Sequence, residues 1–207
     1  MPWPVTHILV AEKFWDSFFS HHDRSAFLIG TCFPDIRYPA QINRELTHFP
    51  DTHIADIDSR PSFQAGMHFH SLTDVLWNTY IRDRQTAIFA IVPHNRAMFH
   101  TLKMLQDRYL YPKGNGWKQV ASFFNAILPE EQGFGIGSDM LNQWHQALAH
   151  YLSKPPTIKD IDMLSISLPD EMVSKIRTYY QTYEGHDQLR SILADFYSAI
   201  DTYLDKI

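Results

Sequence analysis

The segment from Gly66 to Trp77 places two metal-capable side chains one helical turn apart in an otherwise apolar stretch. His70 and Asp74 are four residues apart, so on a helix they share a face, where a neutral imidazole and a carboxylate can hold one divalent ion. Gly66, one turn earlier on that face, would let another backbone or a ligand come close. The same spacing also suits a buried, hydrogen-bonded His–Asp pair, so these residues alone leave two interpretations open.

Three further metal-capable side chains lie at the ends of predicted elements in apolar surroundings: His7, Asp35 and His48. Each also has a purely structural interpretation, which is helix capping for His7, a turn for Asp35 and loop packing for His48. Together with His70 and Asp74 they supply three imidazoles and two carboxylates. These are the ligand types that zinc and other late first-row metals use in proteins.

The elements that must position these residues are predicted to be helices, because the apolar spacing is helical and strand alternation is almost absent. We expect an all-α protein, with residues 1–207 forming a single multi-helix domain of about seven to nine helices. A long structured loop with three prolines is expected over 38–61. Caps, prolines and glycines predict helices over 6–19, 25–33, 62–81, 83–110, 117–128, 138–152, 169–183 and 186–204, and a short one from Pro129. Thr6 is the expected N-cap of the first helix, and Pro93 should kink or break the helix over 83–110.

Composition narrows the class of protein. The chain has 207 residues, of which 44% are hydrophobic and 20% charged, as in soluble globular proteins. Its net charge of −5 argues against general nucleic-acid binding, although a metal ion could still supply positive charge for a small phosphorylated substrate. The single cysteine, Cys32, excludes an internal disulfide and is expected to be a buried thiol. We see no signal peptide and no apolar run of transmembrane length, so we expect a cytoplasmic location.

The order of the motifs resembles that of the zinc-dependent phospholipase C family, whose superfamily also includes the fungal single-strand-specific nucleases. The resemblance covers about the first eighty residues and implies the all-α fold of that family. It also implies that His7, His48, His70 and Asp74 are metal ligands and that Asp35 is a ligand or general base. The segments that carry it are Thr6–Ala11, Ala26–Arg37 with its Pro34-Asp35, Thr47-His48-Phe49 and Gly66-x3-His70-x3-Asp74.

The chain also departs from that family. Members with three metal ions have another histidine soon after the helix aspartate and then a His-x3-Glu pair. Here no histidine lies between Asp74 and His94, and no later histidine begins His-x3-Glu. Secreted members also use their processed N-terminal residue as a ligand, whereas Met1 here precedes His7 without a cleavage pattern. We therefore expect a reduced site with one or two divalent ions, most simply zinc.

The resemblance implies metal-assisted hydrolysis of a phosphoester in a phosphorylated small molecule or lipid. In this hypothesis a metal held by His48, His70 and Asp74 activates water, and Asp74 bridges to a second metal held partly by His7. Asp35 orients or deprotonates the attacking water.

In the same hypothesis Arg37, two residues after Asp35, binds the substrate phosphate. Two alternatives stay open. One is a phosphohydrolase of the HD type using His22-Asp23, and the other is a non-catalytic binding or scaffold protein with a structural metal. An open coordination position would favour an enzyme, and a closed one a scaffold.

Overall fold

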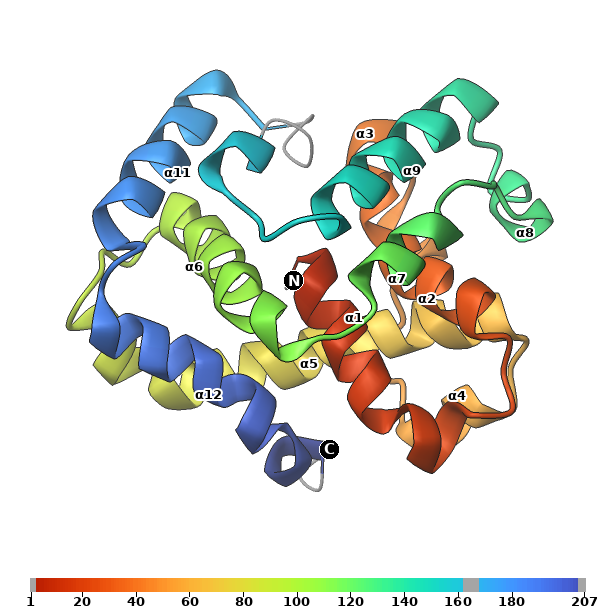
Figure 1. Ribbon diagram of the computed structural model, residues 1–207, viewed down its shortest axis with the longest axis horizontal. Helices are drawn as coiled ribbons and strands as arrows, with labels where there is room; N and C mark the ends of the chain where they lie inside the picture. Colours follow the sequence, from red (N-terminus) through yellow and green to blue (C-terminus); the bar gives the residue numbers. More distant parts are fainter. Residues whose placement is uncertain (1–2, 162–167, 205–207) are drawn as a thin grey trace.

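The structure is a computed structural model that describes residues 3–161 and 168–204, and none of these residues forms a β-strand (Figure 1). The predicted all-α class is therefore confirmed. The longer helices are α1 (Pro4–Phe14), α2 (Arg24–Cys32), α5 (Ser62–Phe89), α6 (Arg96–Leu110), α7 (Trp117–Phe123), α9 (Ser138–Leu152), α11 (Asp170–Tyr183) and α12 (Asp187–Leu204). The shorter elements are α3 (Arg37–Ala40), α4 (Ile54–Asp58), α8 (Pro129–Gln132), a π-helical turn over Trp15–Phe19 and 3-10 turns over Phe33–Ile36, Arg44–Leu46, Tyr111–Lys113 and Ile158–Asp160.

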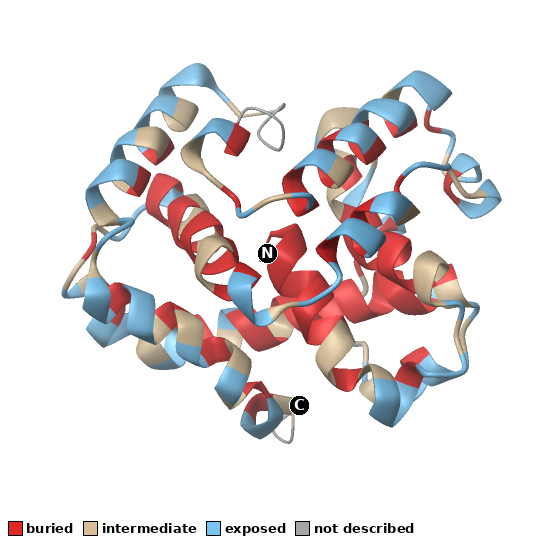
Figure 2. Ribbon diagram, in the orientation of Figure 1, coloured by how far each residue is buried: buried red, intermediate tan, exposed pale blue. Residues whose placement is uncertain are grey.

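Helix α5 crosses the whole molecule and connects its two sides (Figure 1). It packs against α2 and α4 on one side and against α12 on the other. All residues from 65 to 74 are buried, and α1, which also contacts α5, is buried along most of its length (Figure 2). A helix buried on every face lies inside the core, so any polar side chain that α5 carries there needs a partner.

The crossing of α2 and α5 depends on two glycines. A Cβ atom on Gly66 would lie 2.0 Å from the carbonyl oxygen of Phe27 and 2.7 Å from the amide nitrogen of Thr31. A Cβ atom on Gly30 would lie 2.1 Å from the carbonyl oxygen of Phe63. The two helix backbones therefore touch, which confirms the prediction that Gly66 admits another backbone.

Two helix boundaries differ from the prediction. Helix α5 continues past the expected end at Ile81, because the polar residues that follow are mostly exposed on its outer face while Ile88 is buried again. The expected helix over 117–128 stops at Phe123. The break predicted at Pro93 is confirmed, since α6 begins only at Arg96, and the side chain of Asn95 caps it by accepting from the amide of Met98 at 3.0 Å.

The start of α1 also differs. Thr6 is not the N-cap; Trp3 is, and Pro4 takes the first helical position, which suits proline. The hydroxyl of Thr6 instead donates to Asp107 at 2.6 Å, and the same carboxylate accepts from the amides of Val5 and Thr6 at 2.9 Å each. A carboxylate from α6 thus holds the N-terminus of α1, and places His7 in its first turns as predicted.

The predicted long loop over 38–61 is wrong in part, because short helical elements interrupt it. It contains most of α3, the turn over Arg44–Leu46 and α4. His48 follows directly after that turn in an irregular segment, and its side chain is buried. Pro50 and Pro61 lie between elements, and Pro39 lies inside the single turn of α3, where its missing amide proton breaks no internal hydrogen bond.

Candidate metal centre

The structure brings together the five residues predicted for the metal site. His7 comes from α1, Asp35 from the 3-10 turn after α2, His48 from the segment after the turn over Arg44–Leu46, and His70 and Asp74 from α5. Two groups share His70: one is His7, His70 and Asp74, and the other is Asp35, His48 and His70. Within each group the ligand atoms lie within 4.8 Å of one another.

Asp74 lies at the middle of three imidazoles. Its Oδ1 is 3.6 Å from Nε2 of His7, and its Oδ2 is 3.8 Å from Nε2 of His70 and 3.9 Å from Nε2 of His48. These separations exceed those of hydrogen bonds. Two ligand atoms that each lie about 2.0–2.2 Å from a tetrahedral zinc ion are separated by roughly 3.3–3.6 Å, which is close to the spacing found here.

Hydrogen bonds outside the cluster turn two of the rings toward it. Nδ1 of His70 lies 2.9 Å from the carbonyl oxygen of Thr31, which can only accept, so Nδ1 carries the proton and Nε2 presents its lone pair. Nδ1 of His48 lies 2.9 Å from the hydroxyl oxygen of Thr47, which is itself 3.3 Å from the carbonyl oxygen of Arg44. Such bonds fix the tautomer and orientation of metal-binding histidines.

Several buried atoms of the cluster lack hydrogen-bond partners among the described residues. They are both ring nitrogens of His7, Nε2 of His70 and Oδ1 of Asp35. Buried polar atoms are nearly always satisfied in folded proteins, and these four belong to residues with metal-binding chemistry. A divalent ion bound by nitrogen and carboxylate oxygen would satisfy this donor set, so the residues fit the predicted metal.

Burial keeps the imidazoles of His7 and His48 neutral and therefore able to bind metal. It lowers the pKa of His7 well below its usual value, and positive charge on neighbouring His70 would lower it further. Burial also lowers the pKa of His48 to about 2, with His70, Arg44 and Arg37 adding to the effect. The rings of His7 and His70 stack in parallel with centroids 4.0 Å apart. Two cationic rings would repel each other in that arrangement.

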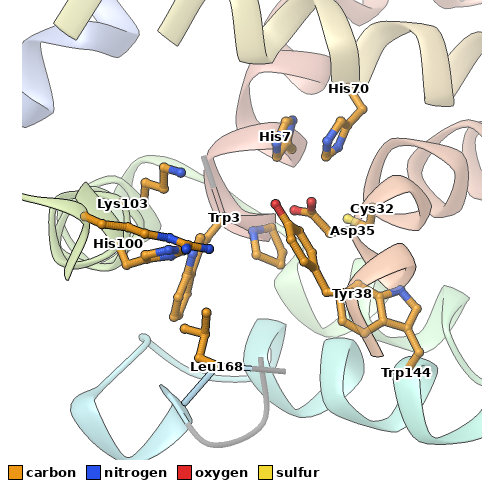
Figure 3. A pocket seen from close by; sticks show the side chains of 12 residues that line it. Trp3, His7, Cys32, Asp35, Tyr38, His70, His100, Lys103, Trp144 and Leu168 are labelled. Atoms are coloured by element: carbon orange, nitrogen blue, oxygen red, sulfur yellow. The ribbon is translucent and has the colours of Figure 1, made fainter. Parts of the chain in front are cut away.

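A cavity of about 120 Å³ opens onto the cluster (Figure 3). His7, His70 and Asp35 line it, whereas Asp74 and His48 are not among its lining residues. Asp35 is thus the carboxylate on the cavity side, and Figure 3 shows it beneath the two imidazoles. Burial raises the pKa of Asp35, with the charge of Asp74 acting in the same direction and that of His70 opposing it.

Cys32 also lines this cavity. Burial, together with the nearby carboxylates of Asp35 and Asp107, raises the pKa of its thiol well above the ordinary value. The side chain is buried and protonated, as the prediction of a buried thiol requires.

The basic residues that line the cavity do not include Arg37, the one predicted to bind the substrate. The guanidinium of Arg37 lies 3.9 Å from the ring centroid of Tyr38, and Arg37 is not among the described residues of the cavity wall. Arg96, His100 and Lys103 of α6 line it instead. Their spacing of four and then three residues places them on one helix face, a pattern visible in the sequence but attached to no known motif.

The other His–Asp segment of interest has a structural role. Asp23, which follows His22, is the N-cap of α2 and accepts from the amide of Ala26 at 2.8 Å and from the hydroxyl of Ser25 at 2.7 Å. This carboxylate is occupied by capping, which does not favour the HD-type alternative.

Comparisons of the chain with protein-family models, curated proteins and solved structures found no match. Within the described part of the chain, no helix combines the length and the apolar character needed to cross a membrane. The geometry of the cluster therefore carries the functional argument. The buried group of His7, His70 and Asp74 could hold a metal ion.

Proposed function

We propose that this protein is a metal-dependent hydrolase of phosphoesters and that its ion is zinc, one or two per chain. The observation that carries the proposal is the convergence of three imidazoles and two carboxylates, with buried ring nitrogens unsatisfied, beside an open cavity. In protein zinc sites a fully ligated ion without access serves structure, whereas catalysis needs an accessible position. Access through the cavity favours the enzyme over the scaffold alternative.

Four residues would hold the ion or ions: His7, His48, His70 and Asp74. When bound, the metal supplies Lewis acidity, which polarises a phosphoryl oxygen and makes water a stronger acid. The bonds from Thr31 and Thr47 keep His70 and His48 in the orientation that binding needs. The chain's own residues thus form the site before any ion arrives, which lowers the cost of ordering it.

Asp35 is the proposed general base. It lies on the cavity side of the cluster, where an attacking water molecule can reach it, and its Oδ1 has no hydrogen-bond partner among the described residues. The raised pKa of its carboxyl brings it closer to neutrality, where a base transfers protons most efficiently. Arg37 was expected to bind the substrate, and in the proposal Arg96 and Lys103 of α6 replace it.

Metal analysis of protein purified without added zinc, and again after zinc is supplied and excess removed, tests the proposal. We expect stoichiometric metal in the wild type, loss of it in His70→Ala and Asp74→Ala, and retention in His53→Ala, which removes an exposed histidine. Circular dichroism confirms folding of each variant. The loaded wild type should hydrolyse a nitrophenyl phosphate monoester or diester, lose this activity with chelator and regain it with zinc. Absence of metal, or bound metal without any such hydrolysis, would overturn the proposal.

A further inference from the structure

One face of α6 carries three basic side chains next to the metal centre. Arg96, His100 and Lys103 all line the cavity described above. In Figure 3, His100 and Lys103 lie across the cavity from Cys32 and Asp35, and the imidazoles of His7 and His70 lie above Asp35. A phosphoryl group at the metal centre would therefore have this basic face on one side.

The same basic face continues into a second cavity. This groove, of about 510 Å³, shares Tyr38 and the three basic residues with the first cavity and extends to Arg44 and His94. Among the described residues that line it there is no carboxylate. The whole chain carries a net charge of −5, so this concentration of positive charge is local to the groove.

Arg96 and Lys103 are not in close contact with acidic side chains of the described residues, although the more distant charges of Asp74 and Asp35 act on Lys103. Among the described residues, neither Arg96 nor Lys103 forms an ion pair with a carboxylate within 4.0 Å. Lys103 is half-buried, and its ammonium lies 5.2 Å from the ring centroid of Trp77. Burial lowers the pKa of Lys103, because it destabilises the charged ammonium form of the side chain. An anion beside it would offset that cost.

We infer that the substrate is a polyanion whose scissile phosphoester lies at the metal centre and whose second phosphate lies in the groove against Arg96 and Lys103. This inference rests on the proposed function for the first phosphate only. A single phosphate at the metal centre would not reach into the outer groove, which extends to His94. Arg offers a planar pair of donors to phosphate oxygens and Lys a compact charge, so the two together suit a phosphate dianion.

Two sugar phosphates that differ by one phosphate provide the test: fructose 6-phosphate and fructose 1,6-bisphosphate. Binding is measured by calorimetry on zinc-loaded protein and again after chelation. We expect the bisphosphate to bind at least about tenfold more tightly than the monophosphate, and we expect Arg96→Gln and Lys103→Met each to remove most of that preference. The matched controls Arg82→Gln and Lys118→Met remove exposed charges away from both cavities and should keep it.

The outcomes separate this inference from the proposed function. If the protein holds no zinc but the preference for the bisphosphate persists and depends on Arg96 and Lys103, the metal hydrolase fails and the anion-binding groove stands. If zinc binds but the two sugar phosphates bind equally, or if the control variants lose the preference as fully as the α6 variants, the inference is overturned. Failure of the wild type to bind the bisphosphate at all also overturns it.

Discussion

Two buried regions of this molecule combine histidine with carboxylate, and they differ in how far their polar atoms are hydrogen-bonded. In the first, Nε2 of His145 lies 2.7 Å from Oε1 of Glu131, and Nδ1 of His145 lies 3.2 Å from the carbonyl oxygen of Phe124. Oε2 of Glu131 accepts from the amide of Leu128 at 2.7 Å. Both ring nitrogens and both carboxylate oxygens of this pair are therefore used within the protein.

The candidate metal centre has the same residue types, but not all of its ring nitrogens have hydrogen-bond partners among the described residues. Its imidazole nitrogens stand 3.6–3.9 Å from the oxygens of Asp74, and both nitrogens of His7 lack hydrogen-bond partners among the described residues. A cavity reaches its edge, whereas neither Glu131 nor His145 lines either cavity described above. The difference shows that a buried His–carboxylate cluster is a candidate ligand set when its atoms are too far apart to bond one another and are turned toward a common point.

The largest expected effect is on stability, and it tests the fully hydrogen-bonded pair of His145 and Glu131. Glu131→Ala should lower the free energy of unfolding by about 3–5 kcal/mol, because it leaves a buried imidazole nitrogen and the amide of Leu128 without their partner. Zinc stoichiometry should stay that of the wild type, since Glu131 is not part of either ligand group. Urea denaturation and metal analysis of the folded variant measure the two quantities. Loss of zinc from a folded Glu131→Ala protein would contradict the comparison.

A third buried carboxylate links the two kinds of region. Both carboxylate oxygens of Asp107 accept hydrogen bonds, as those of Glu131 do. Its donors lie at the start of α1, the helix that carries His7. Asp107→Asn should cost about 2 kcal/mol of stability, because an amide has one acceptor oxygen and turns its NH₂ toward the donors of Val5 and Thr6. It should also weaken zinc binding, since His7 loses its fixed position.

The stability difference between the wild type and Asp107→Asn should depend on pH, and the pKa of Asp107 gives the direction. Burial raises the pKa of Asp107 to about 7 from an ordinary value of 3.8, with the bonds from Thr6 and Val5 opposing the shift. Between these values the native carboxyl keeps its proton while the unfolded one loses it, so the contribution of this group to stability is full below about pH 4 and is lost as pH rises to about 7. The stability difference between wild type and Asp107→Asn should therefore shrink from pH 5 to pH 8. Urea denaturation at both pH values measures it, and an unchanged difference would contradict the burial argument.

Much of the helical framework could be predicted from the sequence, because helix spacing, prolines and glycines act locally. The break at Pro93 and the close approach at Gly66 are such features. The role of Thr6 could not be predicted, since its partner Asp107 lies a hundred residues away in the chain. The assignment to a phospholipase C-like fold, beyond the all-α class, stays a prediction.

The candidate site also combines features that local sequence predicts with features that depend on distant parts of the chain. The types and spacing of His70 and Asp74 predicted a shared face, but only the fold gives the distances that separate a ligand set from a bonded pair. The basic face of α6 was missed because its residues belong to no motif, and its meaning depends on where α6 packs. Long-range packing, which spacing along one helix does not encode, decides which side chains share a cavity.

The smallest expected effect is on zinc affinity, and it is tested by removing each of two threonine–histidine hydrogen bonds. Thr47→Val keeps the shape of a buried side chain and removes the hydroxyl that fixes Nδ1 of His48, so zinc affinity should fall about tenfold, near the lower end for such supporting bonds. Thr52→Val is the matched control, because Thr52 makes the same 2.9 Å bond to Nδ1 of His68, which is outside the ligand groups. Competition with a chelating dye measures both affinities. Equal zinc affinity in the two variants would remove His48 from the ligand set and leave its bond to Thr47 as packing, like that of His68.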